Sequence, residues 1–295
     1  MHRVEIEINR LIEEIDYDEV TRLFATLSGG KRLRAKLILK IAGSNEKAPL
    51  LAAIVELIHG ASLLHDDVID EAALRRGVAS VNATEGSKTA VMLGDILYSK
   101  AFSELVSFDK KIAKIIASSV TALSKGEMMD VKMSESFNGD EDKYLDMLYL
   151  KTAALIEASA EAAAILAGKD PISHALYGRN LGLSFQIIDD ILDITSDAAT
   201  LGKPAMNDFV EGKCTLPYIY LYNVLNDDDK NKLRSLHTKT LCDQEAIWIK
   251  ERMSEHKTIE RSFELAQRLS DEAMNALSGD IELVNILQTM IKRSY

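Results

Sequence analysis

Apolar residues recur at spacings of three and four along most of the chain, and this periodicity constrains the fold more than any other feature. In the segment 50–69 they occupy positions 54, 57, 58, 61, 64 and 68, which places them on one face of a helix. Comparable patterns cover 90–108, 112–133, 144–167 and 173–194, and weaker ones cover 216–225 and 259–291. No convincing alternation typical of a β-strand accompanies them. The sequence therefore predicts an all-α protein.

Turn-forming residues separate the predicted helices. The chain has only 15 Gly and 4 Pro, so it lacks the frequent turn signals of an all-β protein. Loops are expected at 29–30, 43–45, 76–77, 137–140, 168–171 and 202–204. No stretch is long or biased enough in composition to be an interdomain linker. We therefore predict a single domain over residues 1–295, with 47% apolar residues to form its core.

The charge and the cysteines disfavour several classes of protein. A net charge of −11 disfavours a nucleic-acid partner, because nucleic-acid binders normally carry a basic surface. Cys214 and Cys242 have no metal-type spacing and are expected to be reduced thiols. The segment 1–15 has no signal-peptide core, and no apolar run reaches the roughly 18 residues that span a bilayer. We therefore expect a soluble, cytoplasmic protein without a transmembrane segment.

Three aspartates, Asp66, Asp67 and Asp70, end an otherwise apolar predicted helix. Asp66 and Asp70 are four residues apart and share one helical face, which Ser62 and His59 extend backward. Like charges at this spacing destabilise a helix, and carboxylates at its C-terminus oppose the helix dipole. A bound cation would offset both costs, and oxygen-only ligands suit magnesium. The alternative for this cluster alone is a solvated acidic helix end.

A second copy of the pattern Asp-Asp-x-x-Asp is formed by Asp189, Asp190 and Asp193, again within an apolar segment. Asp189 and Asp193 share a helical face, and Gln186 lies one turn earlier on it. Two copies inside apolar helices are hard to explain as solvated surface. Six carboxylates around one cavity would repel one another without metal, whereas several magnesium ions would let them hold a diphosphate.

Basic residues accompany the acidic clusters. Lys31 and Arg34 follow Gly29-Gly30 and are three residues apart, so they can converge on one anion. They open a predicted helix, whose free N–H groups favour phosphate. Arg75 and Arg76 follow the first acidic cluster, where a local salt-bridge network explains them equally well.

These motifs together, in this order, resemble the trans-isoprenyl diphosphate synthases, also called polyprenyl synthetases, and in particular their octaprenyl-type members. The matching stretches are GGKRLR (29–34), ELIHGASLLHDDVID (56–70), LRRG (74–77), GD (94–95), KTA (151–153), FQIIDDILD (185–193), LGKPAMND (201–208) and EGKCTLP (211–217). They span most of the chain, and the C-terminal part carries little of the resemblance. Two departures, Ala35 for the usual Pro and Ala205-Met206 where Gly often precedes Asn-Asp, change no charge.

The resemblance implies an all-α fold with helices around a deep central cavity, and a role for each matching residue. The implied cofactor is Mg²⁺, at about two or three ions per active site, bound directly by Asp66, Asp70 and Asp189 with support from Asp67, Asp190 and Asp193. The diphosphate of isopentenyl diphosphate would be bound by Lys31, Arg34, His59 and Arg76. The allylic diphosphate would be bound by Arg75, Lys151, Thr152, Gln186 and Lys203, with Lys213 a weaker candidate. Lys151 and Lys203 would also stabilise the departing diphosphate, which makes them catalytic together with the direct metal ligands.

The implied reaction is the repeated head-to-tail condensation of isopentenyl diphosphate with an allylic diphosphate, farnesyl diphosphate above all. The allylic diphosphate leaves, the double bond of isopentenyl diphosphate attacks the resulting cation, and proton loss restores an alkene. The family further implies a homodimer, a place in isoprenoid and quinone side-chain biosynthesis, and only transient membrane contact during product release.

Product length is expected to depend on Ala61 and Ser62, one helical turn before Asp66. One turn rises about 5.4 Å, close to the length of one isoprene unit. Short-chain members of the family commonly carry an aromatic residue here, so two small residues leave the cavity open at this depth. Candidates for a deeper floor are Ile54, Leu57 and Phe102. We therefore expect a medium- or long-chain all-trans product, octaprenyl diphosphate above all; close helix packing is the competing explanation for the small residues.

Other interpretations stay open. A short-chain synthase for farnesyl or geranylgeranyl diphosphate differs only in product length. A class I terpene cyclase or a head-to-head condensing enzyme lacks a matched GGKRLR segment for a second diphosphate. A non-catalytic isoprenoid-binding subunit would be expected to have eroded aspartate clusters, and both are intact here. A helical scaffold protein with acidic ends explains none of the basic motifs.

Overall fold

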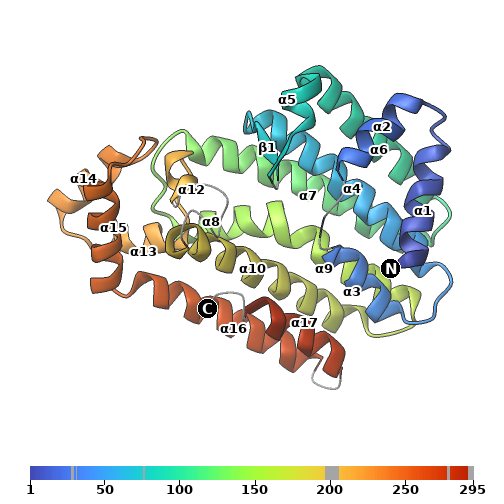
Figure 1. Ribbon diagram of the computed structural model, residues 1–295. Helices are drawn as coiled ribbons and strands as arrows, with labels where there is room; N and C mark the ends of the chain where they lie inside the picture. Colours follow the sequence, from blue (N-terminus) through green and yellow to red (C-terminus); the bar gives the residue numbers. More distant parts are fainter. Residues whose placement is uncertain (28–29, 31, 76, 197–205, 278–279, 292–295) are drawn as a thin grey trace. The chain divides into compact units, whose positions relative to one another are not determined.

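A computed structural model describes residues 1–27, 30, 32–75, 77–196, 206–277 and 280–291 (Figure 1). Over these residues the protein consists of helices and one short β-hairpin, which confirms the predicted all-α fold. Contacts between Cα atoms divide the chain into two compact units, Met1–Thr121 with Leu155–Gly178 and Ala122–Ala154 with Arg179–Tyr295. The expectation of one domain over residues 1–295 stays a prediction, because such a division does not test whether either unit folds alone.

The first unit is built around α4, Ala48–Ile69, in which every residue from 51 to 58 is buried. The helices that pack against α4 are α1 (His2–Glu13), α3 (Leu33–Ala42) and α6 (Ser87–Leu105) (Figure 1). The shorter elements are α2 (Asp18–Thr26), β1 (Leu74–Arg75), β2 (Val78–Ala79) and α5 (Val81–Glu85). A helix that is apolar on all sides is stable only when neighbours cover it, and this packing fixes the acidic end of α4.

α4 is also the one described helix whose length and composition would let it cross a membrane. Its mean hydropathy reaches 1.5 over a window of 18 residues, although Glu56 and the aspartates interrupt any fully apolar run. In the structure 67% of that window is buried. The surrounding helices therefore account for this hydrophobicity without a bilayer.

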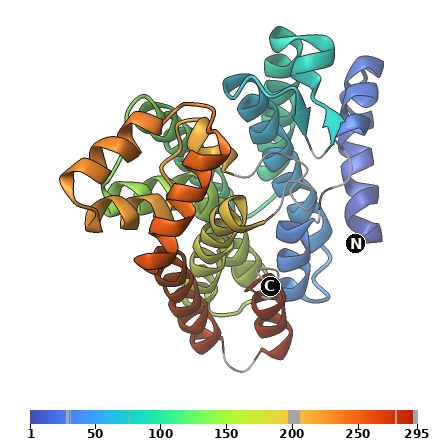
Figure 2. The ribbon, with the colours of Figure 1, turned by 60° about the vertical axis from the view of Figure 1, so that its left-hand side comes forward.

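The second unit consists of Arg179–Tyr295, about two-fifths of the chain, and the earlier helical segment Ala122–Ala154. Its elements are α8 (Glu141–Leu148), η1 (Tyr149–Ala153), α12 (Asn207–Val210), α13 (Leu216–Val224), α14 (Asp227–Leu236), α15 (Asp243–Glu255), α16 (Thr258–Ala276) and α17 (Ile281–Ile291). Helices α13, α15 and α16 pack on one another, and α17 lies beside α16 (Figure 2). Three helices each contain residues of both units: α7 (Lys110–Ser134), α9 (Ala154–Leu166) and α10 (Pro171–Thr195).

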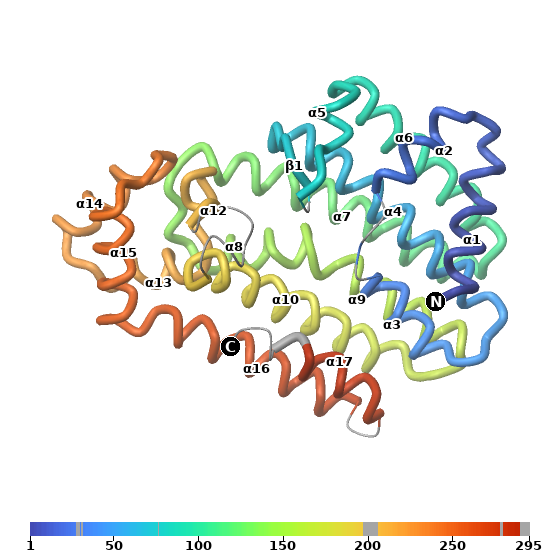
Figure 3. The backbone as a smooth tube through the Cα atoms, in the orientation of Figure 1, coloured from blue at the N-terminus to red at the C-terminus, as the bar shows by residue number. Residues whose placement is uncertain are grey.

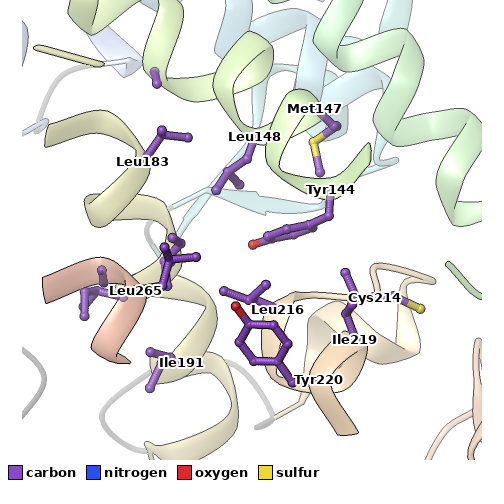
Figure 4. Close-up of a cluster of buried hydrophobic side chains, with 14 residues drawn as sticks. Tyr144, Met147, Leu148, Leu183, Ile191, Cys214, Leu216, Ile219, Tyr220 and Leu265 are labelled. Carbon is purple, nitrogen blue, oxygen red and sulfur yellow. The ribbon is translucent and has the colours of Figure 1, made fainter. Parts of the chain in front are cut away.

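A cluster of buried side chains holds the second unit together between α8, α10 and α13. Tyr144 and Leu148 of α8 meet Leu183 and Ile191 of α10 and Leu216 of α13 (Figure 4). Burying one such side chain stabilises a fold by about 1.5–3 kcal/mol. The cluster therefore fixes the part of α10 that carries the second aspartate motif.

The long predicted helices agree with the observed ones within a few residues, and the differences are local. The predicted segment 144–167 contains the π-helical turn η1 between α8 and α9, and the predicted segment 259–291 is two helices, α16 and α17 (Figure 3). The hairpin, in which Leu74 pairs with Ala79 and Arg75 with Val78, was not predicted. Strands of two residues are too short to show an alternating pattern.

Both cysteines are free, as expected for reduced thiols, and they differ in exposure. We expect iodoacetamide to alkylate the exposed Cys242 and to spare the buried Cys214 in the folded protein. Burial raises the pKa of the Cys214 thiol to about 12, so the reactive thiolate is scarce at neutral pH. Mass spectrometry of tryptic peptides should show Cys214 labelled at least about tenfold more slowly. Protein unfolded in urea is the control, and equal rates in the folded protein would contradict the burial of Cys214.

Candidate active site

The first aspartate cluster lies at the C-terminal end of α4. Asp66 is half-buried, Asp70 is the exposed C-cap residue, and Asp67 is only 2% exposed. The Asp70 amide donates to the Asp66 carbonyl at 2.8 Å, so the two residues keep the helical spacing that places them on one face. Asp66 and Asp70 are therefore the members of this cluster that are open to a ligand.

Asp67 binds Arg75 within the same unit. Arg75 Nε donates to Asp67 Oδ1 at 2.7 Å, and Nη2 lies 2.6 Å from the same oxygen. The Asp67 carbonyl accepts the Ala72 amide at 2.9 Å and the Asn82 side chain at 3.2 Å. Arg75 therefore forms the local salt bridge that was one of the two explanations for Arg75 and Arg76. This salt bridge connects the hairpin to the end of α4. Arg76 lies outside the described residues.

The basic segment at the start of α3 turns sharply at Arg32. This residue has a left-handed φ of 50° and forms the N-cap of α3. Its guanidinium lies 3.2 Å from Glu5 and 3.2 Å from Glu56, which is 5% exposed. Glu56 also accepts the Ala35 amide at 3.1 Å. One N–H group that we expected to be free for phosphate at this helix N-terminus is therefore bound by a protein carboxylate.

A cavity of about 450 Å³ in the first unit brings several of these residues together. Among its lining residues are the predicted His59, Asp67 and Arg75, and also Arg32 and Glu56, which the sequence analysis did not single out. A carboxylate inside the apolar run of α4 was the available signal for Glu56. Arg34 is half-buried in the first turn of α3, and Lys31 lies outside the described residues.

The second aspartate cluster lies in the C-terminal half of α10. Asp189 is half-buried, whereas Asp190 and Asp193 are each 3% exposed. Asp190 accepts hydrogen bonds from the Tyr144 hydroxyl and from Gln186 Nε2, the latter at 3.1 Å. The two buried aspartates therefore belong to the interior of the unit, and Asp189 is the member open to a ligand.

Negative charge accumulates around Asp190. Burial raises the pKa of Asp190 well above its usual range, and nearby Asp208 and Asp189 raise it further against the opposing hydrogen bonds. Asp193 Oδ2 also accepts the Asp208 amide at 3.2 Å, which brings the short helix α12 to the cluster. Carboxylates that raise one another's pKa favour a bound cation, because a positive charge stabilises their ionised forms.

The KTA motif lies in η1, the π-helical turn Tyr149–Ala153. Such turns interrupt α-helices and frequently occur at functional sites. Lys151 Nζ lies 2.6 Å from Asp130 Oδ2 and 2.8 Å from Glu127 Oε2, both on α7. Thr152 donates to Gln186 Oε1 at 3.4 Å, and Gln186 in turn contacts Asp190. The π-turn and α10 therefore share one polar network.

A second cavity, of about 160 Å³, gathers these side chains within the second unit. Its lining includes the predicted Lys151, Thr152, Gln186, Asp190 and Lys213, and also Asp130, Tyr144 and Asp208, which the sequence analysis gave no role. Lys213 Nζ lies 3.0 Å from Glu211. Acidic residues three apart on a predicted helix were the available signal for Glu127 and Asp130. Lys203 lies outside the described residues.

The positions expected to control product length lie in the interior of α4. Ala61 is fully buried, and Ser62 is half-buried with its hydroxyl bonded to the backbone one turn earlier at 2.9 Å. Ile54 and Leu57 are fully buried, whereas Phe102 is 36% exposed. A cavity floor needs a side chain inside the fold, so Ile54 and Leu57 remain better candidates than Phe102.

The donor atoms suit a hard divalent cation. Among the residues that the structure describes, no three His, Cys, Asp or Glu side chains form a metal site by themselves. Mg²⁺ usually binds through one or two carboxylates together with substrate phosphates and water. Asp66 and Asp70 form a solvent-accessible pair at a helix end, and Asp189 is the most exposed member of the other cluster. A metal bound at either cluster would therefore depend on the substrate for further ligands.

Comparison with known proteins identifies the family. The sequence profile of the Polyprenyl synthetase family matches residues 18–253. This chain belongs to the polyprenyl synthetase family. It is 43% identical to the octaprenyl pyrophosphate synthase of Helicobacter pylori, with a TM-score of 0.93 over 99% of this chain and 97% of that one. Among other polyprenyl synthetases, the geranylgeranyl diphosphate synthase of Sulfolobus acidocaldarius is 32% identical over 92% of this chain and 88% of that protein.

A third relative was crystallised with ligands. It is a polyprenyl synthase from Caulobacter crescentus in complex with calcium and isoprenyl diphosphate, 31% identical, with a TM-score of 0.86 over 99% of this chain and 95% of that one. Polyprenyl synthetases use a divalent metal to bind diphosphate. The calcium in that structure agrees with the oxygen-rich donors described above.

Membership of the polyprenyl synthetase family confirms the predicted fold class and enzyme class. The chain is a trans-prenyl diphosphate synthase, a prenyltransferase of isoprenoid biosynthesis. This result favours a chain-elongating synthase over a terpene cyclase, a non-catalytic subunit or a scaffold protein. The products named for its relatives range from geranylgeranyl through octaprenyl and nonaprenyl to decaprenyl diphosphate, so membership does not by itself set the product length.

Proposed function

We propose that this synthase adds isopentenyl diphosphate repeatedly to farnesyl diphosphate and stops at octaprenyl diphosphate. The observation that carries this proposal is the pair of small residues, Ala61 and Ser62, one turn before the first aspartate cluster. The 43% identity to an octaprenyl synthase along nearly the whole chain supports it. A geranylgeranyl product is the second candidate, favoured by the relative from Sulfolobus acidocaldarius.

The test is product analysis of the purified full chain. Incubation with labelled isopentenyl diphosphate, farnesyl diphosphate and magnesium should give octaprenyl diphosphate as the main species in mass spectrometry. Termination at geranylgeranyl diphosphate would establish the second candidate instead. No incorporation of label with any allylic primer would contradict both.

The proposed roles follow the burial of the aspartates within each cluster. Asp66, Asp70 and Asp189 would hold magnesium, which neutralises the allylic diphosphate and makes it a better leaving group. The buried Asp67 and Asp190 would act through their neighbours. Asp67 accepts a hydrogen bond from Arg75, and Asp190 accepts hydrogen bonds from Tyr144 and Gln186. Asp193 would fix the start of α12. The protein then supplies cations to the departing diphosphate through Lys151 and Lys203.

We further propose that the enzyme acts in the cytoplasm as a homodimer and that its product supplies quinone side chains. Support for these proposals comes from the family expectation. Light scattering of the purified chain tests the dimer, and a monomer at micromolar concentration would contradict it.

Two diphosphate pockets imply two separable kinetic effects. Lys31→Ala and Arg34→Ala should each raise KM for isopentenyl diphosphate, whereas Lys203→Ala should act on the allylic substrate or its ionisation. Each lost charge-assisted contact is worth roughly 1.5–3 kcal/mol, so we expect ten- to hundredfold effects. Steady-state kinetics with each substrate varied in turn measure this.

The control for these variants is Lys36→Ala, which removes an exposed cation from the same helix as Arg34. It should leave both KM values near those of the wild type. Equal effects of Lys31→Ala on both substrates would argue against two separate pockets.

A further inference from the structure

Two acidic residues of α7, Glu127 and Asp130, hold the ammonium group of Lys151. The distances from Lys151 Nζ are 2.8 Å to Glu127 and 2.6 Å to Asp130. The three side chains are largely buried, with exposed fractions of 22% for Lys151, 12% for Glu127 and 10% for Asp130. A lysine bound by two buried carboxylates loses most of the mobility that exposed lysines keep.

The backbone is arranged for this contact. Gly126 precedes the two acids on α7, and a Cβ atom there would lie 2.4 Å from the Lys151 backbone nitrogen and 2.7 Å from the Leu150 carbonyl carbon. No side chain fits at these distances, so glycine is what lets α7 touch the π-turn. The extra residue of a π-turn also changes the direction of the following side chains. Glycine and π-turn together bring Lys151 within reach of both carboxylates.

The two carboxylates carry more negative charge than neutralisation of the Lys151 ammonium group requires. Two carboxylates around one ammonium leave a net negative charge, although one carboxylate would suffice to pair the lysine. Burial alone would lower the pKa of Lys151, but the attraction of Asp130 and Glu127 outweighs burial and raises it. Lys151 therefore stays protonated, and since an ammonium has three N–H donors, one remains for a ligand.

Lys151 and Asp130 line the same cavity as Thr152, Gln186 and Asp190. A salt bridge made only for stability does not need a place among these polar side chains. We propose that Glu127 and Asp130 are positioning residues that fix Lys151 for the allylic diphosphate. This inference rests on the proposed function of Lys151 and adds residues that act through it.

A fixed ammonium is ready for the charge that develops on the departing diphosphate, so its benefit belongs to the chemical step. Glu127→Gln and Asp130→Asn keep the side-chain shape and remove one charge each. We expect either variant to lower kcat about ten- to hundredfold. The KM for isopentenyl diphosphate should stay within about twofold of the wild type, because uniform binding of that substrate is untouched. Glu135→Gln, at an exposed acid directly after the end of α7, is the matched control and should behave as wild type.

A double-mutant cycle separates positioning from general damage. If the two acids act through Lys151, then Glu127→Gln placed on Lys151→Ala should cause no further loss of kcat. Additive losses in the double variant would overturn the proposal, since they would show that Glu127 acts on something else.

A measurement that does not need turnover completes the test. Acetylation of amines with an N-hydroxysuccinimide ester requires the unprotonated form, so wild-type Lys151 should react at least about tenfold more slowly than the 68% exposed Lys143. Glu127→Gln and Asp130→Asn should each accelerate acetylation of Lys151, as measured by peptide mass spectrometry. Unchanged amine reactivity in both variants, with kcat lowered only in Lys151→Ala, would overturn the positioning role and leave the role of Lys151 standing. Accelerated acetylation with unchanged kcat in every variant, Lys151→Ala included, would overturn the role proposed for Lys151 and the positioning role with it.

Discussion

Asp66→Asn and Asp189→Asn are each expected to lower turnover by orders of magnitude while the helical fold stays intact. Both residues are the half-buried members of their clusters, and in the proposed function each is a carboxylate ligand of a magnesium ion that binds diphosphate. Replacing a carboxylate by an amide removes that charge with almost no change in shape. The loss should appear in kcat at saturating magnesium and both substrates.

The stability of the two variants distinguishes a metal ligand from a structural residue. Removing one of several mutually repelling carboxylates should leave the melting temperature of the metal-free protein unchanged or slightly higher. Magnesium with inorganic diphosphate should raise the melting temperature of the wild type, because a ligand that binds only the folded state stabilises it, and this increase should be lost in both variants. Asp271→Asn, an exposed aspartate of α16, serves as the control. Near wild-type turnover of either variant at saturating magnesium would show that its cluster does not hold the metal.

Asp67→Asn makes a useful contrast with Asp66→Asn, since the two residues are adjacent in sequence and differ in surroundings. The buried Asp67 carboxylate binds Arg75, so its loss leaves a half-buried guanidinium without its partner. Breaking such a pair destabilises a protein, whereas the change at Asp66 should not. The sequence placed both residues in one motif, and only the fold separates their environments.

The helices that carry the site were predictable because their periodicity is strong and their ends are marked. α4 and α10 have apolar residues at helical spacing and turn-forming residues on both sides, and both were found within a few residues of their predicted limits. The π-turn at Tyr149–Ala153 was not predictable in this way, since one extra residue in a turn leaves composition and pattern almost unchanged. The two-residue strands of the hairpin are likewise below the length at which alternation shows.

The acidic motifs were recognisable in the sequence, but their surroundings were not. Lys151 contacts carboxylates more than twenty residues earlier in the chain, and the sequence offers no local signal for this pairing. Glu56 occurs inside a motif that was singled out, yet its bonds to Arg32 and to the Ala35 amide depend on how α3 packs on α4. Such contacts arise from tertiary packing. A local pattern can therefore indicate which residues take part in a site but not which of them are held by others.

Ser62→Phe and Ala61→Phe are expected to convert the enzyme into a short-chain synthase that still condenses isopentenyl diphosphate. In the proposed function the growing chain starts at the aspartates of α4 and extends away from them, so a phenyl ring one turn back would block it after the first additions. Ser62 is half-buried and offers some room, whereas the fully buried Ala61 is surrounded by the core of its unit. Forcing a large side chain into a packed site costs about 1–3 kcal/mol, so Ala61→Phe should also lower the melting temperature.

Product analysis by mass spectrometry then separates length control from helix packing. Under length control, Ser62→Phe shifts the main product made from farnesyl diphosphate to geranylgeranyl diphosphate, while its melting temperature stays close to that of the wild type. Ser254→Phe, an exposed position on α15, controls for the added aromatic side chain and should leave the product unchanged. If Ala61 and Ser62 serve only close helix packing, both phenylalanine variants lose stability and still make the full-length product. That outcome, or a wild-type enzyme that already stops at a short chain, would show that Ala61 and Ser62 do not set the product length in the proposed way.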